Sequence, residues 1–173
     1  MKQKNLFNIP KEPPCSKFVS VYRVSLVKDK SISFGNRRLS NSKEAQALIQ
    51  QLIMKRGQND REQFAVILLN AKNDIIGVNI VSVGGLSSAS VYPREVLKPA
   101  ILANSAAMIL CHNHPSNSLE PSPEDLAITK KIVQASELMG ITVHEHLIIS
   151  LEDERYFSMA DNGIIKKFYD EIA

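Results

Sequence analysis

Residues 112–125 read HNHPSNSLEPSPED, and this stretch decides how the rest of the chain is interpreted. His112 and His114 are separated by one residue, so on a β-strand both side chains point to the same face. Ser122 and Asp125 follow in a Ser-Pro-Glu-Asp pattern that begins a helix. Two imidazoles and one carboxylate suit Zn²⁺, and three protein ligands leave a fourth position open for water. The stretch therefore predicts a zinc site of the catalytic type, with His112, His114 and Asp125 as ligands and one ion per chain.

Ser122 and Asp125 also have a purely structural interpretation. Ser-x-x-Asp before an apolar helix is an ordinary capping box, and a single histidine beside a strand usually has a structural role. The metal interpretation is preferred because the His-x-His-Pro element, a loop of small and polar residues and the helix start occur together in one short run.

The spacing of this run, His-x-His, seven residues, Ser, two residues, Asp, resembles the motif of the JAMM (MPN+, JAB) metalloproteases. The longer run HNHPSNSLEPSPEDLAIT is similar to the RadC branch of that family. The resemblance extends over roughly residues 60 to 160, from EQFAVILLN through GGLSSASVYPRE. Full-length bacterial RadC proteins carry a helix-hairpin-helix region ahead of this domain. Residues 1–59 show no such pattern, so the chain resembles a short form.

This resemblance implies both a fold and an activity. The fold is cytidine-deaminase-like and α/β (α+β) in class, with a curved, mixed, mainly antiparallel sheet flanked by helices. The activity is that of a zinc metallopeptidase-like hydrolase acting on a peptide or isopeptide bond of a peptide or protein substrate, with ubiquitin-like proteins among the candidates. The alternative is a metal-binding or non-catalytic interaction module beside DNA-processing proteins, because RadC proteins carry a DNA-repair label.

The resemblance also implies a glutamate that acts on the metal-bound water from the head of the first core strand. Glu62, just before the apolar run 64–69, matches that place, although a solvated charge at a strand entrance is the ordinary interpretation. Glu95 is the competitor, but it lies at an expected helix start, where an acidic side chain is favoured anyway. Ser122 is expected to donate a hydrogen bond to the developing oxyanion. Asn117 stands where RadC proteins usually have Gly, which puts the shape of the metal-site loop in question.

Three further residues near the motif are of types that can bind a metal. His144 and His146 share a strand face, in a region where RadC proteins typically show Asp-His and this chain has Glu145-His146. A second metal pair is possible there by spacing, but a partner of the first site or a satisfied core histidine is preferred. Cys111 points to the strand face opposite the two motif histidines, so we expect a small buried hydrophobe.

Length, composition and net charge limit the classes of protein to which this chain can belong. A chain of 173 residues with 44% hydrophobic content fits one globular domain. A net charge of +3 and 6% aromatic content argue against direct nucleic-acid binding, which needs clustered basic residues with interleaved aromatics. With two cysteines, no signal peptide and no apolar run of the ~20 residues that a membrane span needs, we expect a cytoplasmic protein without a membrane segment.

Three regions are expected along the chain. Residues 1–17 form a flexible arm, residues 18–59 an extension with a strand at 18–26 and a helix that begins at Asn41, and residues 60–173 the RadC-like JAB domain. Small residues near 84–90 suggest a strand edge on which an extended substrate peptide could pair. Within the JAB domain, periodicity predicts strands at 64–69, 75–83, 106–111, 141–149 and 156–159, and helices at 93–103, 122–139 and 164–172.

Overall fold

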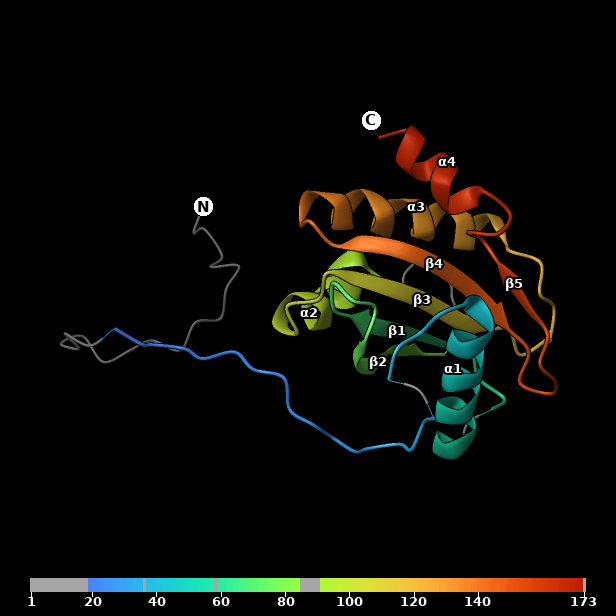
Figure 1. The fold of residues 1–173 in the computed structure, drawn as a ribbon, viewed down its shortest axis with the longest axis horizontal. Coiled ribbons are helices and arrows are strands. Elements are labelled where there is room, and N and C mark those ends of the chain that lie inside the picture. Colours follow the sequence, from blue (N-terminus) through green and yellow to red (C-terminus); the bar gives the residue numbers. More distant parts are fainter. Residues whose placement is uncertain (1–18, 36, 58, 85–90, 173) are drawn as a thin grey trace, which may run out of the picture.

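The computed structural model describes residues 19–35, 37–57, 59–84 and 91–172, and over these residues the chain forms a five-stranded sheet with helices on both faces (Figure 1). The elements follow in the order α1 (Ser42–Arg56), β1 (Gln63–Leu69), β2 (Ile75–Val83), α2 (Pro93–Leu102), β3 (Ala107–Asn113), α3 (Pro123–Leu138), β4 (Thr142–Ile149), β5 (Tyr156–Ser158) and α4 (Ile164–Asp170).

The strands lie in the order β2-β1-β3-β4-β5, so β1 and β3 occupy the middle of the sheet. β1 pairs antiparallel with β2 and with β3, and β4 pairs antiparallel with β5. Only β3 and β4 run parallel among the described strands, and α3 makes the crossover that a parallel pair requires. This confirms the expected α/β fold with a mixed, mainly antiparallel sheet flanked by helices.

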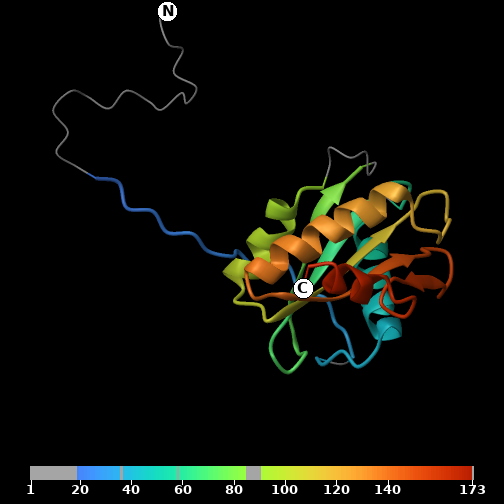
Figure 2. The ribbon, with the colours of Figure 1, turned by 90° about the horizontal axis from the view of Figure 1, so that it is seen from above.

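The central strands are buried on both faces of the sheet, which explains why residues 64–69 of β1 and 107–111 of β3 are all apolar. Alternate residues of β1 point to opposite sides: Phe64 and Val66 pack with residues of α2, α3 and α4, whereas Ala65 and Ile67 pack with residues of α1. Every residue of β1 and of β3 is buried. Figure 2, seen from above, shows α3 crossing the sheet with α4 beside it.

Particular residues account for the start of α1 and lie inside α2. Asn41 caps α1 by accepting a hydrogen bond from the Glu44 amide at 2.9 Å, as its position before an apolar helix predicts. α2 continues through Pro99, which lies inside it. None of the helices in the described ranges combines the length and apolar character that crossing a bilayer requires.

The strand expected at 18–26 is wrong over residues 19–26, which form neither helix nor strand. Ile32 and Phe34 are the first of the described residues to pack against the core. The first backbone hydrogen bonds to the sheet in the described chain are at residues 37–39, where the Ile75 amide donates to the Arg37 carbonyl at 2.8 Å and the Leu39 amide donates to the Asn73 carbonyl at 3.2 Å. Strand propensity alone does not order this segment, since a strand also needs a neighbouring edge for its hydrogen bonds. Residues 1–18, including the expected arm, and residues 85–90 of the expected peptide-binding edge lie outside the described residues.

The central position of β3 leads to a stability prediction. Leu110 is fully buried in the core that α3 covers, whereas Leu138 at the end of α3 is 85% exposed. We expect Leu110→Ala to lower the free energy of unfolding by about 2–5 kcal/mol, because it removes buried methyl groups and leaves a cavity. The same substitution at Leu138 should change it by less than about 0.5 kcal/mol. Urea denaturation measures both, and equal effects would contradict this account of the core.

Candidate metal centre

Three elements bring the predicted site residues to the carboxyl end of β3. β3 carries His112 and leads directly into His114, and the first turn of α3 supplies Asp125. The antiparallel register of β1 and β3 sets Phe64 opposite His112, so Glu62, two residues earlier, lies beside His114. All four side chains thus meet at the edge of the core that α3 covers.

The nitrogen and oxygen atoms of this cluster converge on one point. The Nε2 atoms of His112 and His114 are 3.0 Å apart. Asp125 Oδ1 lies 3.3 Å from His112 Nε2, and Asp125 Oδ2 lies 3.4 Å from His114 Nε2. Glu62 Oε1 is farther, at 3.9 Å from His114 Nε2. One ligand atom from each residue lies within 4.8 Å of all the others, an arrangement that suits a metal ion.

The capping box of α3 fixes the Asp125 carboxylate. Its Oδ2 atom accepts hydrogen bonds from the Ser122 amide at 2.8 Å and from the Ser122 hydroxyl at 2.6 Å, while the Asp125 amide donates to Ser122 Oγ at 3.1 Å. The structural and functional interpretations of Ser-x-x-Asp therefore hold together, because the geometry that begins the helix also orients the carboxylate.

A turn after the strand fixes His114. Its Nδ1 atom lies 2.7 Å from the Ser118 carbonyl, which can only accept, so Nδ1 carries a proton and Nε2, the atom available to a metal, faces Asp125. Asn117 has a φ of 58° in the left-handed region that favours glycine, and its amide donates to the His114 carbonyl at 2.9 Å. Asn enters this region more readily than most residues, so the turn is kept without the family's Gly.

His112 is fixed from behind by His146, which is buried. His112 Nδ1 lies 2.8 Å from His146 Nε2, and His146 Nδ1 contacts the hydroxyl of Thr129 on α3. The His112 ring also stacks on Phe64, with centroids 6.0 Å apart and planes at 8°. The expectation that His146 supports the first site agrees with these contacts. Thr129 was missed, and its one sequence signal is its position four residues after Asp125 on the same helix.

The charges in the cluster support cation binding. Burial acts to raise the pKa of Asp125, but its close contacts with the His112 and His114 rings outweigh burial and hold that pKa well below its usual range. Asp125 in turn raises the pKa of His114. Burial keeps the pKa of His146 well below its ordinary value, so this ring is neutral. The centre therefore presents an ionised carboxylate to any bound cation.

Three other candidate residues lie outside the cluster. Glu95 pairs with Lys98 Nζ at 2.5 Å, and this contact lowers its pKa. His144 Nε2 lies 3.2 Å from Asn73 Oδ1. Cys111 is buried on the α1 side of the sheet, and burial raises the pKa of its thiol. Over the described ranges, no other group of three or more His, Cys, Asp or Glu side chains could hold a metal.

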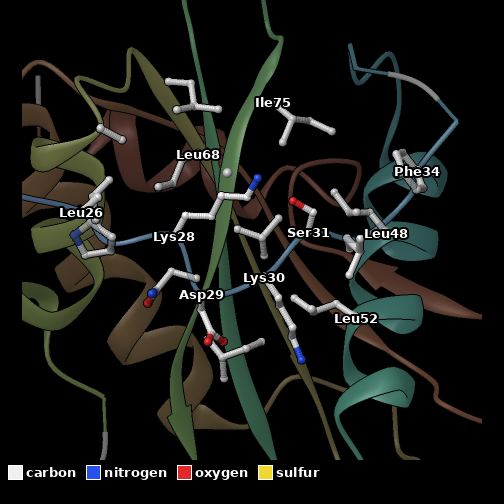
Figure 3. Close-up of a pocket in the computed structure, with 18 of the residues that line it drawn as sticks. Leu26, Lys28, Asp29, Lys30, Ser31, Phe34, Leu48, Leu52, Leu68 and Ile75 are labelled. Carbon is white, nitrogen blue, oxygen red and sulfur yellow. The ribbon is translucent and has the colours of Figure 1, made fainter.

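A separate hollow of about 680 Å³ lies beside the edge strand β2 (Figure 3). Residues 26–34, α1, β2 and α2 line it, and none of the four cluster residues does. The hollow is therefore distinct from the metal centre.

This chain is similar to a known protein family and to proteins named UPF0758. A family model described as RadC-like JAB domain matches residues 39–164, a range that includes α1. A UPF0758 protein of Rubrobacter xylanophilus is 49% identical over 106 residues, which are 61% of this chain and 45% of that protein. A UPF0758 protein of Methanosarcina mazei is 32% identical over 174 residues, covering 96% of this chain and 74% of that protein. The alignment thus spans less than half of the Rubrobacter relative, and neither name states an activity.

The geometry predicts that one divalent metal ion binds per chain. Elemental analysis of the purified protein should find about one equivalent. His112→Ala and Asp125→Ala should each abolish it, because either change leaves only two of the three closest ligands. His144→Ala is the matched control and should keep the metal, since His144 lies outside the cluster. A full equivalent retained by both ligand variants would exclude the site.

Proposed function

The chain belongs to the RadC-like JAB domain family, and from that premise we propose that it is a zinc-dependent hydrolase of a peptide or isopeptide bond. One observation carries the proposal: the Nε2 atoms of His112 and His114 and the carboxylate of Asp125 converge on one point, with Glu62 beside them. The residues that hold the ion in this proposal are His112, His114 and Asp125.

The donor set fits zinc in both chemistry and spacing. Ligand atoms about 2.0–2.1 Å from a tetrahedral zinc are roughly 3.3–3.4 Å from one another. The corresponding separations in this cluster are 3.0, 3.3 and 3.4 Å. His114 Nε2 presents a lone pair to His112 Nε2 at that short distance, which is favourable only with a cation or a proton between the rings. Three ligands of this kind leave one position for water, as in catalytic zinc sites.

Glu62 has the position of a general base in this proposal. When bound, zinc lowers the pKa of a coordinated water to about 7 and polarises a carbonyl. Glu62 would take a proton from the attacking water and return it to the leaving amine as the C–N bond breaks. Its Oε1 lies 3.9 Å from His114 Nε2, farther than Asp125 Oδ2 at 3.4 Å, which supports a base beside the ion over a fourth ligand. Glu95, paired with Lys98, is the weaker candidate.

Ser122 is proposed to stabilise the oxyanion. Its hydroxyl is held at 2.6 Å from Asp125 Oδ2, at the rim of the cluster. In the reaction this O–H would donate to the oxygen of the scissile carbonyl as negative charge develops, a contribution worth about 3 kcal/mol for one well-placed donor.

The substrate in this proposal is a peptide or protein, with a ubiquitin-like protein as one candidate, acted on in the cytoplasm and without direct nucleic-acid binding. The alternative function is a non-catalytic or metal-binding interaction module beside DNA-processing proteins. The complete set of Glu62, His112, His114, Ser122 and Asp125 favours the hydrolase, because a scaffold has no need of a general base.

The proposal is tested by substituting each candidate base. Glu62→Gln should keep one equivalent of zinc and lose hydrolysis by at least about 10²-fold, since it removes the proton acceptor and none of the three ligands. Glu95→Gln is the matched control and should keep both the bound zinc and the hydrolytic activity. The measurement is cleavage of a peptide library and of isopeptide-linked peptides by zinc-loaded and chelator-treated protein.

Two outcomes would contradict this proposal. Loss of hydrolysis in Glu95→Gln but not in Glu62→Gln would move the base to the start of α2. If the zinc-loaded protein cleaves no peptide or isopeptide, the interaction module becomes the preferred function.

A further inference from the structure

A buried chain of hydrogen bonds joins two of the proposed ligands from behind. It runs from the Asp125 carbonyl to the Thr129 hydroxyl, from Thr129 Oγ1 to His146 Nδ1, and from His146 Nε2 to His112 Nδ1 at 2.8 Å. Thr129, His146 and His112 are each fully buried, so water does not substitute for a missing partner. The chain starts at α3, crosses β4 and ends on β3.

The Asp125 carbonyl, the first member of this series of hydrogen bonds, determines which atom donates in each of them. The Asp125 carbonyl can only accept, and it is far closer to Thr129 Oγ1 than the Met159 sulfur at 3.7 Å, so the Thr129 proton goes to the carbonyl. Thr129 Oγ1 then accepts from His146 Nδ1–H. His146 is fully buried and its two ring nitrogens contact only a hydroxyl and another imidazole, an environment that disfavours a charged ring. Its lone pair therefore lies on Nε2 and accepts from His112 Nδ1–H.

We propose that Thr129 and His146 are positioning residues that hold the proton of His112 on Nδ1 and so direct its Nε2 lone pair into the metal centre. This inference rests on the proposed zinc site. Without the Thr129 hydroxyl, His146 Nδ1–H has no acceptor. The His146 proton then moves to Nε2 and donates to His112 Nδ1, which places the His112 proton on Nε2, where it opposes metal binding.

The test compares Thr129→Val, which keeps the shape of the side chain and removes the hydroxyl, with Thr129→Ser, which keeps the hydroxyl. Zinc affinity measured against a competing chelator should fall about 10–100-fold in Thr129→Val and be restored in Thr129→Ser, as expected for a hydrogen bond behind a ligand. Nitrogen-15 NMR of the histidine rings in metal-free protein should show the His112 proton on Nδ1 in the wild type and on Nε2 in Thr129→Val.

The outcomes separate this inference from the proposed function. Unchanged zinc affinity in Thr129→Val, or an Nε2 proton on His112 in the metal-free wild type, overturns the positioning role while the zinc site stands. Failure of the wild type to bind zinc overturns the proposed site itself, and the NMR measurement then decides the proton chain independently.

A second inference concerns the segment 19–27, VSVYRVSLV, which is apolar and strand-forming in composition yet exposed. No backbone hydrogen bond joins residues 19–34 to the rest of the described chain. The exposed fractions of its large apolar side chains are 89% for Val19, 95% for Val21, 86% for Tyr22, 74% for Val24, 48% for Leu26 and 88% for Val27. A contiguous apolar surface of this kind marks an interaction site.

The outer edge of β2 matches segment 19–27 in length. β2 lies at the end of the sheet, and its first residue, Ile75, donates its amide proton to the Arg37 carbonyl on the outer side. Beyond Ile75, no backbone hydrogen bond from the described chain reaches the outer edge of β2, so that part of the edge presents unpaired backbone groups. β2 is nine residues long, as is segment 19–27, and the hollow in Figure 3 lies beside it. Ile76 on this strand is 44% exposed.

We infer that segment 19–27 of one copy pairs with the β2 edge of a second copy, and that the exchange is reciprocal. Figures 1 and 2 both show the first part of this segment, coloured dark blue, running away from the sheet of its own chain. Residues 26–32 and 34 then line the hollow beside β2 but make no backbone hydrogen bond to that strand. A reciprocal exchange gives a closed two-fold dimer in which each sheet gains a sixth strand and the exposed valines are covered.

Light scattering of the full chain across a concentration series tests the exchange. The wild type should be a dimer at micromolar concentration. Val21→Pro with Val24→Pro should make it monomeric, because proline removes the backbone donors that strand pairing needs. Val21→Thr with Val24→Thr is the control that keeps both amides and the β-branched shape, and it should still dimerise. Zinc binding should be unchanged in both variants, which reports an intact fold.

A monomeric wild type overturns the inference, and protection of amides 19–27 from hydrogen exchange in that monomer would place the segment on its own β2 edge. A dimer that persists in the proline variant overturns it as well, because the dimer contact would then lie elsewhere.

Discussion

The antiparallel pairing of β1 with β3 sets the register on which the metal centre depends. It places Phe64 opposite His112, with the two rings stacked at 6.0 Å, and it carries Glu62 to the side of His114. Side chains alternate between faces, so a slip of one residue would turn both histidines to the α1 side of the sheet. The apolar run of residues 64–69 in β1, buried on both faces, holds this register in place.

Hydrogen bonds of buried polar side chains tie the elements together around the site. Glu145, where RadC proteins typically have Asp, accepts hydrogen bonds from Ser42 Oγ on α1, from Ser158 Oγ on β5 and from the amides of His146 and Ala160. Four donors offset the cost of burying a carboxylate. Since Glu145 is adjacent to His146, the same contacts hold the strand that supports His112.

Local patterns were sufficient for most of the fold and for the three residues that meet in the candidate metal centre. The fully buried strands were recognisable as apolar runs, α3 from its Ser-Pro start and Gly140 end, and His112, His114 and Asp125 from their spacing. The strand expected at 18–26 failed because the prediction rested on valine content, while a strand exists only where another edge satisfies its backbone. The question raised by Asn117 was answered by its φ of 58°, a backbone property that composition does not report.

The sequence by itself determined the order of elements, the buried face of each and the metal-binding residue types, because these follow from periodicity and from spacing within a short run of chain. The tertiary structure alone decided which residues from distant segments meet. Glu62 was separated from Glu95 by the strand register, which places one beside His114 and leaves the other with Lys98. Thr129 reaches His146 only because α3 packs across β4, and no local pattern encodes a contact that forms through packing of two separate elements.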